Sequence, residues 1–265
     1  MSNLKYIVLI KQVPDMEKVE FNYEEGRIDR SSAPLEPNPF DLNGLEEAVK
    51  YKEECGGEVV ALSMGPEQAK STLKDALARG ADRGILLHGK EFAGSDTWAT
   101  SLALGHAIEK IGDYDLIFAG EKTVDGDTGQ VGPEVAEFLD LPHVAFVSSV
   151  NKREEDEVQV TAESWGVSYR KALKLPGLIT VTKDVNEPRL PSFKDKRRAR
   201  KAEVTVWGVE EISINPDLLG LDGSPTMVSD MEVPPPDTRE PEIFRNGTED
   251  AVNKLVNRID WGASK

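Results

Sequence analysis

Short apolar runs alternate along the chain with longer segments in which apolar residues recur every three or four positions. The short runs are rich in β-branched residues, as are strands that are covered on both faces. They predict strands at 6–10, 58–64, 84–88, 115–120, 143–150 and 178–182. The longer segments have one apolar helical face, which predicts helices at 41–54, 65–80, 95–112 and 133–140. This alternation predicts a three-layer α/β/α, Rossmann-like fold with a mostly parallel sheet.

Two parts of the chain depart from this alternation. Residues 157–164 and 167–175 alternate between apolar and polar side chains, which predicts an inserted hairpin. Beyond about Trp207 the periodicity fades, and proline is frequent in 232–244. We therefore expect one α/β domain over residues 1–225 and an extended C-terminal arm over residues 226–265.

The end of the predicted arm is amphipathic. Its apolar face, within residues 248–259, consists of Val252, Leu255, Val256 and Ile259. Such a face needs a surface to cover. Both the chain's own domain and a partner protein meet this requirement, so the residues leave both alternatives open.

The composition narrows the class of protein. Among 265 residues, 32 Lys and Arg stand against 48 Asp and Glu, which gives a net charge of −16 and argues against non-specific nucleic-acid binding. Cys55 is the one cysteine, so an internal disulfide is excluded and a reducing, cytoplasmic compartment is expected. No apolar run is long enough for a direct membrane span. The three histidines are too scattered to predict a metal site.

The stretch AGEKTVDGDTGQVGPEVAEFL, residues 119–139, places glycines and acids where the fourth strand joins a helix. In open α/β sheets, ligands bind beyond the carboxyl ends of the strands. Gly126, Gly129 and Gly132 permit positive φ and a close approach of the main chain to a ligand. The following helix offers unpaired N–H groups and the positive end of its dipole. These features favour an anion site, most naturally for a phosphate.

The acids of this stretch would repel a phosphate if they faced it. We therefore expect Asp125 and Asp127 to accept hydrogen bonds from loop N–H groups or to meet sugar hydroxyls, while Thr128 and Gln130 donate directly. Familiar motifs do not fit: Asp127 stands where a P-loop needs Lys, the G-x-G-x-x-G spacing is absent, and a calcium loop fails at its sixth and twelfth positions. An Asp-Gly turn that only caps the helix is the open alternative.

Three further polar segments are expected at the same edge of the sheet. They are residues 11–15, 36–41 and 94–101. Each alone is explained by a cap or a turn. Together they suit an adenine nucleotide, so the predicted sheet is of the adenine-nucleotide-binding kind.

Five segments between residue 4 and about residue 205 resemble the small (beta) subunit of electron-transfer flavoproteins. They read VLIKQVPD, NPFDLNGLEEAV, SMGPEQAKSTLKDALARGADRGILL, LIFAGEKTVDGDTGQVGPEVAEFLDLP and VTKDVNEPRLPS. The resemblance implies an obligate alpha subunit that carries a mobile FAD, and an arm that packs on that subunit. It also implies nucleotide contacts at Leu9, Asn38, Pro39, Phe40, Asp41, Met64, Gly120, Thr123, Val124, Asp125, Gly126, Asp127, Thr128, Gly129, Gln130 and Val131.

The family has two versions of this subunit. One holds a structural AMP and only shuttles electrons, whereas the other holds a second FAD that accepts hydride from NADH and bifurcates the electron pair. VDGDTGQVGP and GSDTWATS look like the FAD version. The resemblance thus places Asp96, Thr97 and Thr100 at the flavin, where the two hydroxyls, one helical turn apart, can reach its diphosphate or ring edge. The alternative is that these residues only cap the helix.

A stand-alone ATP-binding sensor or adenylating enzyme on a related sheet is a further alternative. The Ser-Gly-Gly-x-Asp-Ser pyrophosphatase loop of such enzymes is absent, which disfavours it. Under the resemblance, the chain is an electron carrier that is redox-active only within a flavoprotein complex.

The segment 184–204 carries a basic run on an acidic chain. Residues 194–201 hold six positive charges and one negative charge. A nucleic-acid patch would need stacking aromatics, and Phe193 stands alone; a solvated helix face is the simplest alternative. The resemblance implies a partner loop in which an exposed Leu190, followed by Pro191, enters a pocket of a redox partner. Such partners include an acyl-CoA dehydrogenase, a quinone oxidoreductase or ferredoxin.

Overall fold

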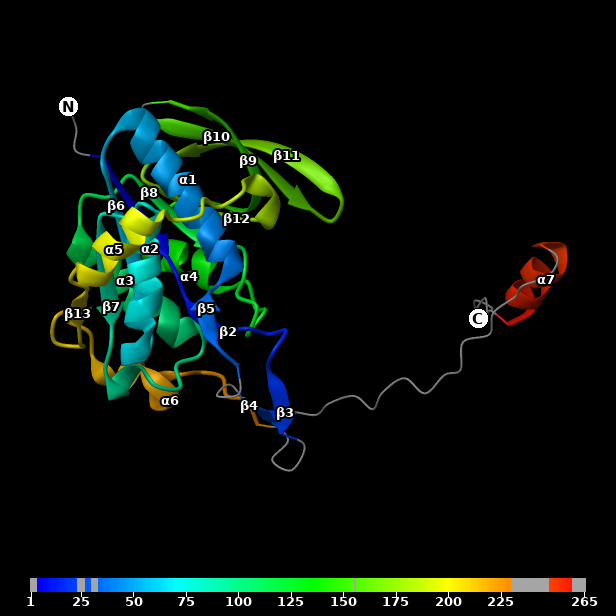
Figure 1. Cartoon of the computed structure of the whole chain (residues 1–265), viewed down its shortest axis with the longest axis horizontal. Coiled ribbons are helices and arrows are strands. Elements are labelled where there is room, and N and C mark those ends of the chain that lie inside the picture. The colour runs from blue at the N-terminus through cyan, green and yellow to red at the C-terminus, as the bar shows by residue number, and fades with distance from the viewer. Residues whose placement is uncertain (1–3, 23–26, 30–32, 155, 230–247, 259–265) are drawn as a thin grey trace. The chain divides into compact units, whose positions relative to one another are not determined.

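A computed structural model describes residues 4–22, 27–29, 33–154, 156–229 and 248–258. Across these residues, nine strands form one sheet in the order β11-β10-β9-β12-β8-β1-β6-β7-β13 (Figure 1). The parallel strands are β1 (Lys5–Leu9), β6 (Glu58–Met64), β7 (Arg83–Leu87), β8 (Leu116–Gly120), β9 (His143–Arg153), β12 (Gly177–Val181) and β13 (Thr205–Trp207). The strands β10 (Glu157–Ser164) and β11 (Val167–Lys174) extend the sheet as an antiparallel hairpin. The predicted mostly parallel sheet with a hairpin insertion is confirmed.

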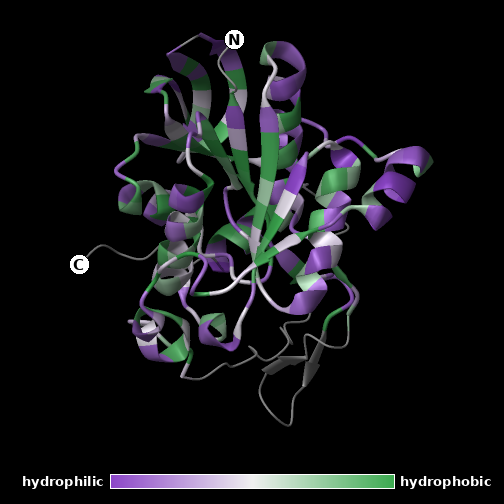
Figure 2. Ribbon diagram, turned by 90° about the vertical axis from the view of Figure 1, so that its left-hand side faces the viewer, coloured by the Kyte–Doolittle hydropathy of each residue, from purple (hydrophilic) through white to green (hydrophobic). Residues whose placement is uncertain are grey.

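Helices cover both faces of this sheet. The helices α1 (Pro39–Cys55), α2 (Lys70–Arg79) and α5 (Phe193–Lys201) pack on one face, and α3 (Thr97–Ile111) and α4 (Val131–Phe138) pack on the other. Figure 2 shows the hydrophobic colour concentrated in the central strands between these helices. The three-layer α/β/α architecture predicted from the sequence is therefore confirmed.

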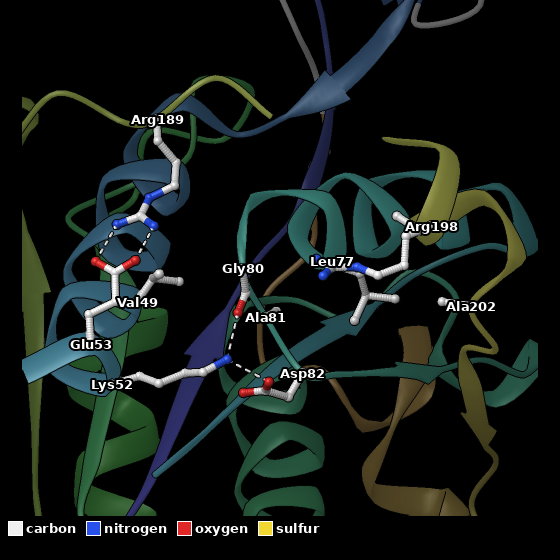
Figure 3. A pocket seen from close by; sticks show the side chains of 11 residues that line it. Val49, Lys52, Glu53, Leu77, Gly80, Ala81, Asp82, Arg189, Arg198 and Ala202 are labelled. Atoms are coloured by element: carbon white, nitrogen blue, oxygen red, sulfur yellow. Dashed lines mark hydrogen bonds and ion pairs between the residues drawn. The ribbon is translucent and has the colours of Figure 1, made fainter. Parts of the chain in front are cut away.

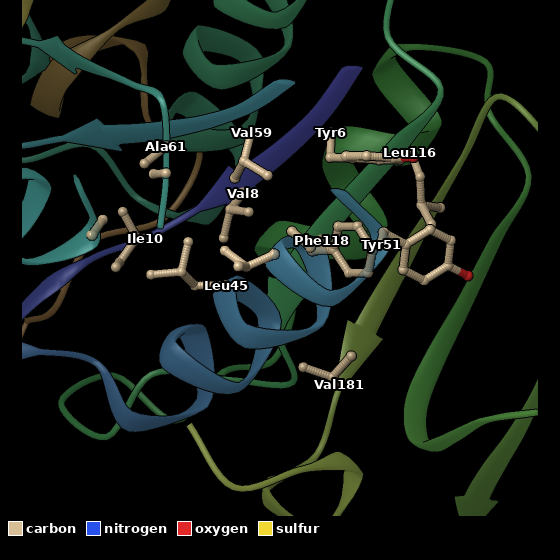
Figure 4. Close-up of a cluster of buried hydrophobic side chains, with 14 of the residues drawn as sticks. Tyr6, Val8, Ile10, Leu45, Tyr51, Val59, Ala61, Leu116, Phe118 and Val181 are labelled. Atoms are coloured by element: carbon tan, nitrogen blue, oxygen red, sulfur yellow. The ribbon is translucent and has the colours of Figure 1, made fainter. Parts of the chain in front are cut away.

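Side chains of β1 alternate between two buried clusters, one on each face of the sheet. Tyr6 and Val8 join α1 and α2 in the first cluster (Figure 4), while Ile7 and Leu9 join α3 and α4 in the second. Leu45, on α1, belongs to the first cluster and is 1% exposed. Burying a side chain of this size stabilises the fold by about 1.5–3 kcal/mol. The positions of α1 and of the end of β1 are thus fixed by the core.

Several elements differ from the predicted ones. The helix predicted from residue 65 begins at Lys70, because Pro66 is extended and a 3₁₀ turn, Glu67–Ala69, follows it. Two short antiparallel pairs were not predicted: β2 (Gln12–Pro14) with β5 (Leu35–Pro37), and β3 (Glu20–Asn22) with β4 (Arg27–Asp29). Elements of three residues are too short to show a periodic pattern.

The chain divides into two compact units, residues 1–230 and residues 231–265. The first unit closes with a short helix, α6 (Gly220–Gly223), and the described part of the second unit is α7 (Thr248–Arg258). The apolar residues Val252, Leu255 and Val256 of α7 are about half exposed. The proline-rich segment 232–244 and Ile259 lie outside the described residues. In the part of the chain that the structure describes, no helix has the length and apolarity to cross a membrane.

Candidate functional site

The order of strands reverses at β1. After β1 the chain builds β6 and β7 on one side of it, and then crosses over to build β8, β9 and β12 on the other. The carboxyl ends of β1 and β8 therefore border a switch point, where open α/β sheets bind ligands. The first turn of α1 meets the β8–α4 loop, residues 121–130, at this point.

Asp41 joins the two strand ends from the first turn of α1. Its side chain is buried, and its carboxylate accepts the main-chain N–H of Lys11 at 2.8 Å and that of Gly120 at 3.1 Å. Burial raises the pKa of Asp41 to about 7, although hydrogen bonds from Lys11, Asn38 and Gly120 act in the opposite direction. A Cβ at Gly120 would lie 2.5 Å from an Asp41 oxygen, so this position admits only glycine. Asp41, expected as a nucleotide contact, holds the framework of the site.

Asn38 fixes the β8–α4 loop in a similar way. The residue is fully buried at the start of α1, and its N–H donates to the Lys11 carbonyl at 2.9 Å. Its side-chain amide donates to the Lys122 carbonyl at 2.9 Å and accepts the N–H of Val124 at 3.2 Å. The next two residues of the predicted site are more exposed than Asn38: Pro39 is exposed and Phe40 is half-buried. Pro39 is the first residue of α1, and the centre of the Phe40 ring lies 5.9 Å from Lys122 Nζ.

Each aspartate of this loop is paired with a lysine. Lys11 Nζ donates to both carboxylate oxygens of Asp125 at 2.8 Å, and Lys122 Nζ lies 2.7 Å from Asp127. The Asp125 side chain is 7% exposed, whereas that of Asp127 is 68% exposed. Loop N–H groups or sugar hydroxyls were the expected partners of these two acids, and neither lysine was predicted. With their charges balanced, the two acids no longer oppose a phosphate at this loop.

The three glycines of the loop region have different roles. Of them, Gly129 has a positive φ, of 64°, and Asp127 shares this conformation with a φ of 54°. Gly126 lies at the exposed tip beside Thr128. Gly132 is buried, and a Cβ there would lie 2.5 Å from Cγ2 of Thr180 on β12. The close approach at Gly132 is thus to the sheet, and the contact of this glycine with a ligand stays a prediction.

The N-termini of α3 and α4 lie side by side. Thr97 Oγ1 on α3 lies 3.2 Å from Oε1 of Glu134 and 3.5 Å from the Gln130 side chain, and Ser101 Oγ donates to Glu134 at 2.9 Å. Thr97 is therefore brought next to the β8–α4 loop, as expected, but its hydroxyl also joins the two helices. Thr100, one turn further along α3, is half-buried. Glu134 was not predicted to take part.

Asp96 caps α3 and holds a distant segment. Its carboxylate accepts the N–H of Ala99 at 3.0 Å and both the N–H and the hydroxyl of Thr226, at 2.9 and 2.7 Å. Burial acts to raise the pKa of Asp96, but these hydrogen bonds outweigh it and lower the pKa. The predicted capping role is confirmed; the contact of Asp96 with a flavin stays a prediction.

Leu9 and Met64 end the strands β1 and β6, on the same edge of the sheet as the β8–α4 loop. Leu9 is buried, and Met64 is partly buried against the second hydrophobic cluster. Both side chains belong to the apolar core at this edge of the sheet, and their contact with a nucleotide stays a prediction. Among the described residues, no group of three or more His, Cys, Asp or Glu side chains could hold a metal ion.

The partner loop, residues 184–204, is fastened to α1 on the N-terminal side of Leu190. Arg189 binds Glu46 through Nε at 2.8 Å and Nη2 at 3.0 Å, and it binds Glu53 at 2.5 and 3.0 Å. Asn43 and Asn186 exchange two hydrogen bonds, at 2.8 and 3.0 Å. Leu190 follows this anchor and is 87% exposed, as predicted, while Pro191 is half-buried.

A cavity of about 470 Å³ lies between α1, α2 and α5, next to the partner loop (Figure 3). Its charged groups are paired: Arg189 with Glu53, and Lys52 Nζ with Asp82 at 2.5 Å. The cavity lies along the C-terminal half of α1, whereas Asp41 lies in its first turn. It is therefore separate from the switch-point site.

Fold and site together define a Rossmann-like α/β protein with polar loops gathered at the switch point of a parallel sheet. Residues 26–212 match the electron transfer flavoprotein domain. The chain is 41% identical over 258 residues to the electron transfer flavoprotein subunit beta of Thermoanaerobacterium thermosaccharolyticum, covering 97% of this chain and 98% of that protein. The protein thus belongs to the electron transfer flavoprotein family, among its beta subunits.

Two further relatives are similar over most of their length. Protein FixA of Sinorhizobium fredii is 39% identical over 264 residues, covering 96% of this chain and 92% of that protein. A protein of Acetobacterium woodii named caffeyl-CoA reductase-Etf complex subunit CarD is 35% identical over 258 residues, covering 97% of this chain and 98% of that protein. The resemblance stated from the motifs is thereby confirmed.

Proposed function

We propose that this chain is the beta subunit of a heterodimeric, electron-bifurcating electron transfer flavoprotein and binds FAD at the switch point between β1 and β8. The observation that carries the proposal is the β8–α4 loop, which Asn38 holds at this point and in which both aspartates are paired with lysines. The motifs VDGDTGQVGP and GSDTWATS, which resemble the FAD version of the subunit, lie in this loop and at the adjacent start of α3.

The residues present fit a phosphate-bearing nucleotide. A Cβ at Gly126 would meet no atom closer than 3.5 Å, so the loop tip has room for a group to approach its main chain. The N-terminus of α4 begins directly after the loop, at Val131, and favours an anion. Leu9 and Met64, predicted nucleotide contacts, are apolar and suit a planar base. Thr128 and Gln130 are exposed and can donate to phosphate or ribose oxygens.

When bound, FAD supplies the redox chemistry: it accepts hydride from NADH and passes single electrons to a high-potential and a low-potential acceptor. The chain's own residues bind and orient it. Asp41 and Asn38 keep the loop at the strand ends, and Thr97 and Thr100 stand where the flavin diphosphate or ring edge would pass.

We propose that the partners are an alpha subunit with a second FAD, and redox proteins such as an acyl-CoA dehydrogenase, a quinone oxidoreductase or ferredoxin, in the cytoplasm. The printed names of the relatives, subunit beta and complex subunit CarD, support a role within a complex. The exposed apolar face of α7 suits a surface of the alpha subunit. Leu190, an exposed apolar side chain on a firmly held loop, suits a brief docking contact.

A count of nucleotides in the purified heterodimer tests the proposal. Two FAD and no AMP per heterodimer are expected after acid release and chromatography. One FAD and one AMP would instead support the alternative, an electron-shuttling subunit with structural AMP in the same site. A stable monomer that hydrolyses ATP would support the second alternative, an ATP-binding sensor or adenylating enzyme.

A further inference from the structure

The β8–α4 loop has no regular secondary structure, so its position depends on contacts with other segments. Its inner half is held by Asn38, through the Lys122 carbonyl and the Val124 N–H. The Lys122–Asp127 ion pair lies within the loop, and Lys122 Nζ also lies 5.9 Å from the centre of the Phe40 ring in α1. Lys11, which comes two residues after β1, reaches the loop from outside and binds Asp125 with both carboxylate oxygens at 2.8 Å.

The base of the Lys11 side chain is itself fixed. Its N–H donates to Asp41 at 2.8 Å, and its carbonyl accepts the N–H of Asn38 at 2.9 Å. Lys11 therefore contacts the start of α1 through its main chain and the outer loop through its side chain. Since β1 lies in the centre of the sheet, Lys11 connects the outer loop to the core.

Burial makes the Lys11–Asp125 pair different from the second pair of the loop. The side chain of Asp125 is 7% exposed and that of Asp127 is 68% exposed. A carboxylate that is withdrawn from water is costly without its partner, whereas an exposed one is solvated at little cost. Loss of Lys11 therefore removes the ion pair by which the end of β1 holds the outer half of the loop.

We infer that Lys11 and Asp125 are positioning residues that hold the β8–α4 loop in its nucleotide-binding conformation before the nucleotide arrives. The inference rests on the proposed function, because it concerns the same site. A loop held in advance does not have to be ordered during binding, and this lowers the entropic cost of binding. The class of ligand is an adenosine phosphate, as in AMP or the adenosine half of FAD.

The positioning role can be separated from simple charge attraction. If Lys11 only attracted phosphate, Asp125→Ala would free this cation and remove a negative charge, and the nucleotide would bind more tightly. If the pair positions the loop, Asp125→Ala weakens binding, as Lys11→Met does. In addition, the double variant is then no weaker than Asp125→Ala alone, because Asp125→Ala already removes the contact with Lys11.

The test uses the full-length chain in complex with its alpha subunit, stripped of nucleotide and titrated with AMP and with FAD. We expect Lys11→Met and Asp125→Ala each to raise the dissociation constant about tenfold. The control Lys152→Met makes the same charge change in an exposed ion pair away from the loop, and should raise it less than about twofold. Lys11→Arg should restore most of the affinity. Hydrogen–deuterium exchange of the nucleotide-free complex should show faster exchange in residues 121–130 for the first two variants only.

Unchanged or tighter binding by Asp125→Ala, together with unchanged exchange in residues 121–130, would overturn the inference. A wild-type complex that takes up neither AMP nor FAD in this chain would instead refute the proposed function. The exchange measurement on the nucleotide-free complex still decides the role of the pair in that case. The two failures are therefore distinguishable.

Discussion

The carboxylate of Asp41 accepts the main-chain N–H of Gly120 at 3.1 Å, which joins the first turn of α1 to the end of β8. Burial raises the pKa of Asp41 from 3.8 to about 7. Between these values the folded protein binds more protons than the unfolded chain, so the contribution of Asp41 to the free energy of unfolding is lost as the pH rises through about 7.

For Asp41→Asn we therefore expect a pH-dependent loss of stability. The wild type should exceed the variant in free energy of unfolding by more at about pH 4.5 than at about pH 7.5, since only the wild type contains the titrating group. Urea unfolding at several pH values measures the difference. A difference that does not change with pH would contradict the raised pKa.

Glycine at position 132 is required for packing, whereas glycine at position 126 is not. Gly132→Ala would place a Cβ 2.5 Å from Thr180 Cγ2, and we expect a loss of about 1–3 kcal/mol in the free energy of unfolding. Gly126→Ala should change stability by less than about 0.5 kcal/mol yet weaken FAD binding, since the new methyl group lies at the exposed tip. Urea unfolding and flavin titration of both variants check this contrast, and equal stability losses would contradict it.

Leu190→Ala should slow electron transfer to a redox partner about tenfold, because a single exposed anchor can supply 1–2 kcal/mol of a docking interaction, or about a factor of ten in rate. The nucleotide content of the complex should not change. Leu221→Ala is the matched control, since Leu221 is also an exposed leucine of the first unit, 60% exposed. Stopped-flow kinetics under pseudo-first-order conditions measure the rate, and equal rates for Leu190→Ala and wild type would contradict the docking role.

Substitution of Arg189 should lower the free energy of unfolding. Arg189→Ala leaves Glu46, 7% exposed, without its charged partner and with only the main-chain N–H of residue 189 at 3.0 Å. We expect a loss of about 3 kcal/mol in the free energy of unfolding. The control Glu53→Gln alters the outer carboxylate, 55% exposed, and should cost less than about 1 kcal/mol. Arg189→Lys should not restore the wild-type value, since lysine cannot bind two carboxylates with a planar fork. Comparable losses of stability for Arg189→Ala and Glu53→Gln would contradict a larger contribution from the buried Glu46 carboxylate.

The two threonines of α3 can be distinguished by substitution with valine. The Thr97 hydroxyl contacts Glu134, so Thr97→Val should lower the free energy of unfolding by about 1 kcal/mol. Thr100 makes no side-chain hydrogen bond with another described residue, and Thr100→Val should weaken FAD binding without loss of stability. Chemical unfolding and flavin titration give the two readouts. If Thr100→Val binds FAD like the wild type, only the capping alternative survives for this residue.

The sequence predicts the layers of the fold and the place of the site because both follow from local patterns. Apolar runs and helical spacing locate the core elements, and the rule for parallel strands brings the polar loops to one edge. The motif resemblance then selects the family. The exposed position of Leu190 was likewise predicted from the resemblance, and the structure confirms it.

The contacts that shape the site could not be predicted in this way. Lys11 and Asp125 are 114 residues apart in sequence, and no periodic pattern connects them. The same holds for Gly132, whose role depends on Thr180 of another strand. The nucleotide contact of Asp41 stays a prediction, but the bonds of its two oxygens to the main-chain N–H groups of Lys11 and Gly120 were not predicted. Such pairings arise only when the sheet brings distant segments together.

Helix α1 contacts both the β8–α4 loop and the partner loop. Its start holds the β8–α4 loop through Asn38, and its Glu46 and Glu53 hold Arg189 beside Leu190. The helix has 17 residues, and each residue added to a helix turns everything beyond it by about 100° and shifts it by about 1.5 Å. An insertion between Asp41 and Glu46 would therefore rotate the carboxylates that hold Arg189 away from the loop they fasten. The spacing within this one helix therefore sets the geometry between the switch-point site and the loop that carries Leu190.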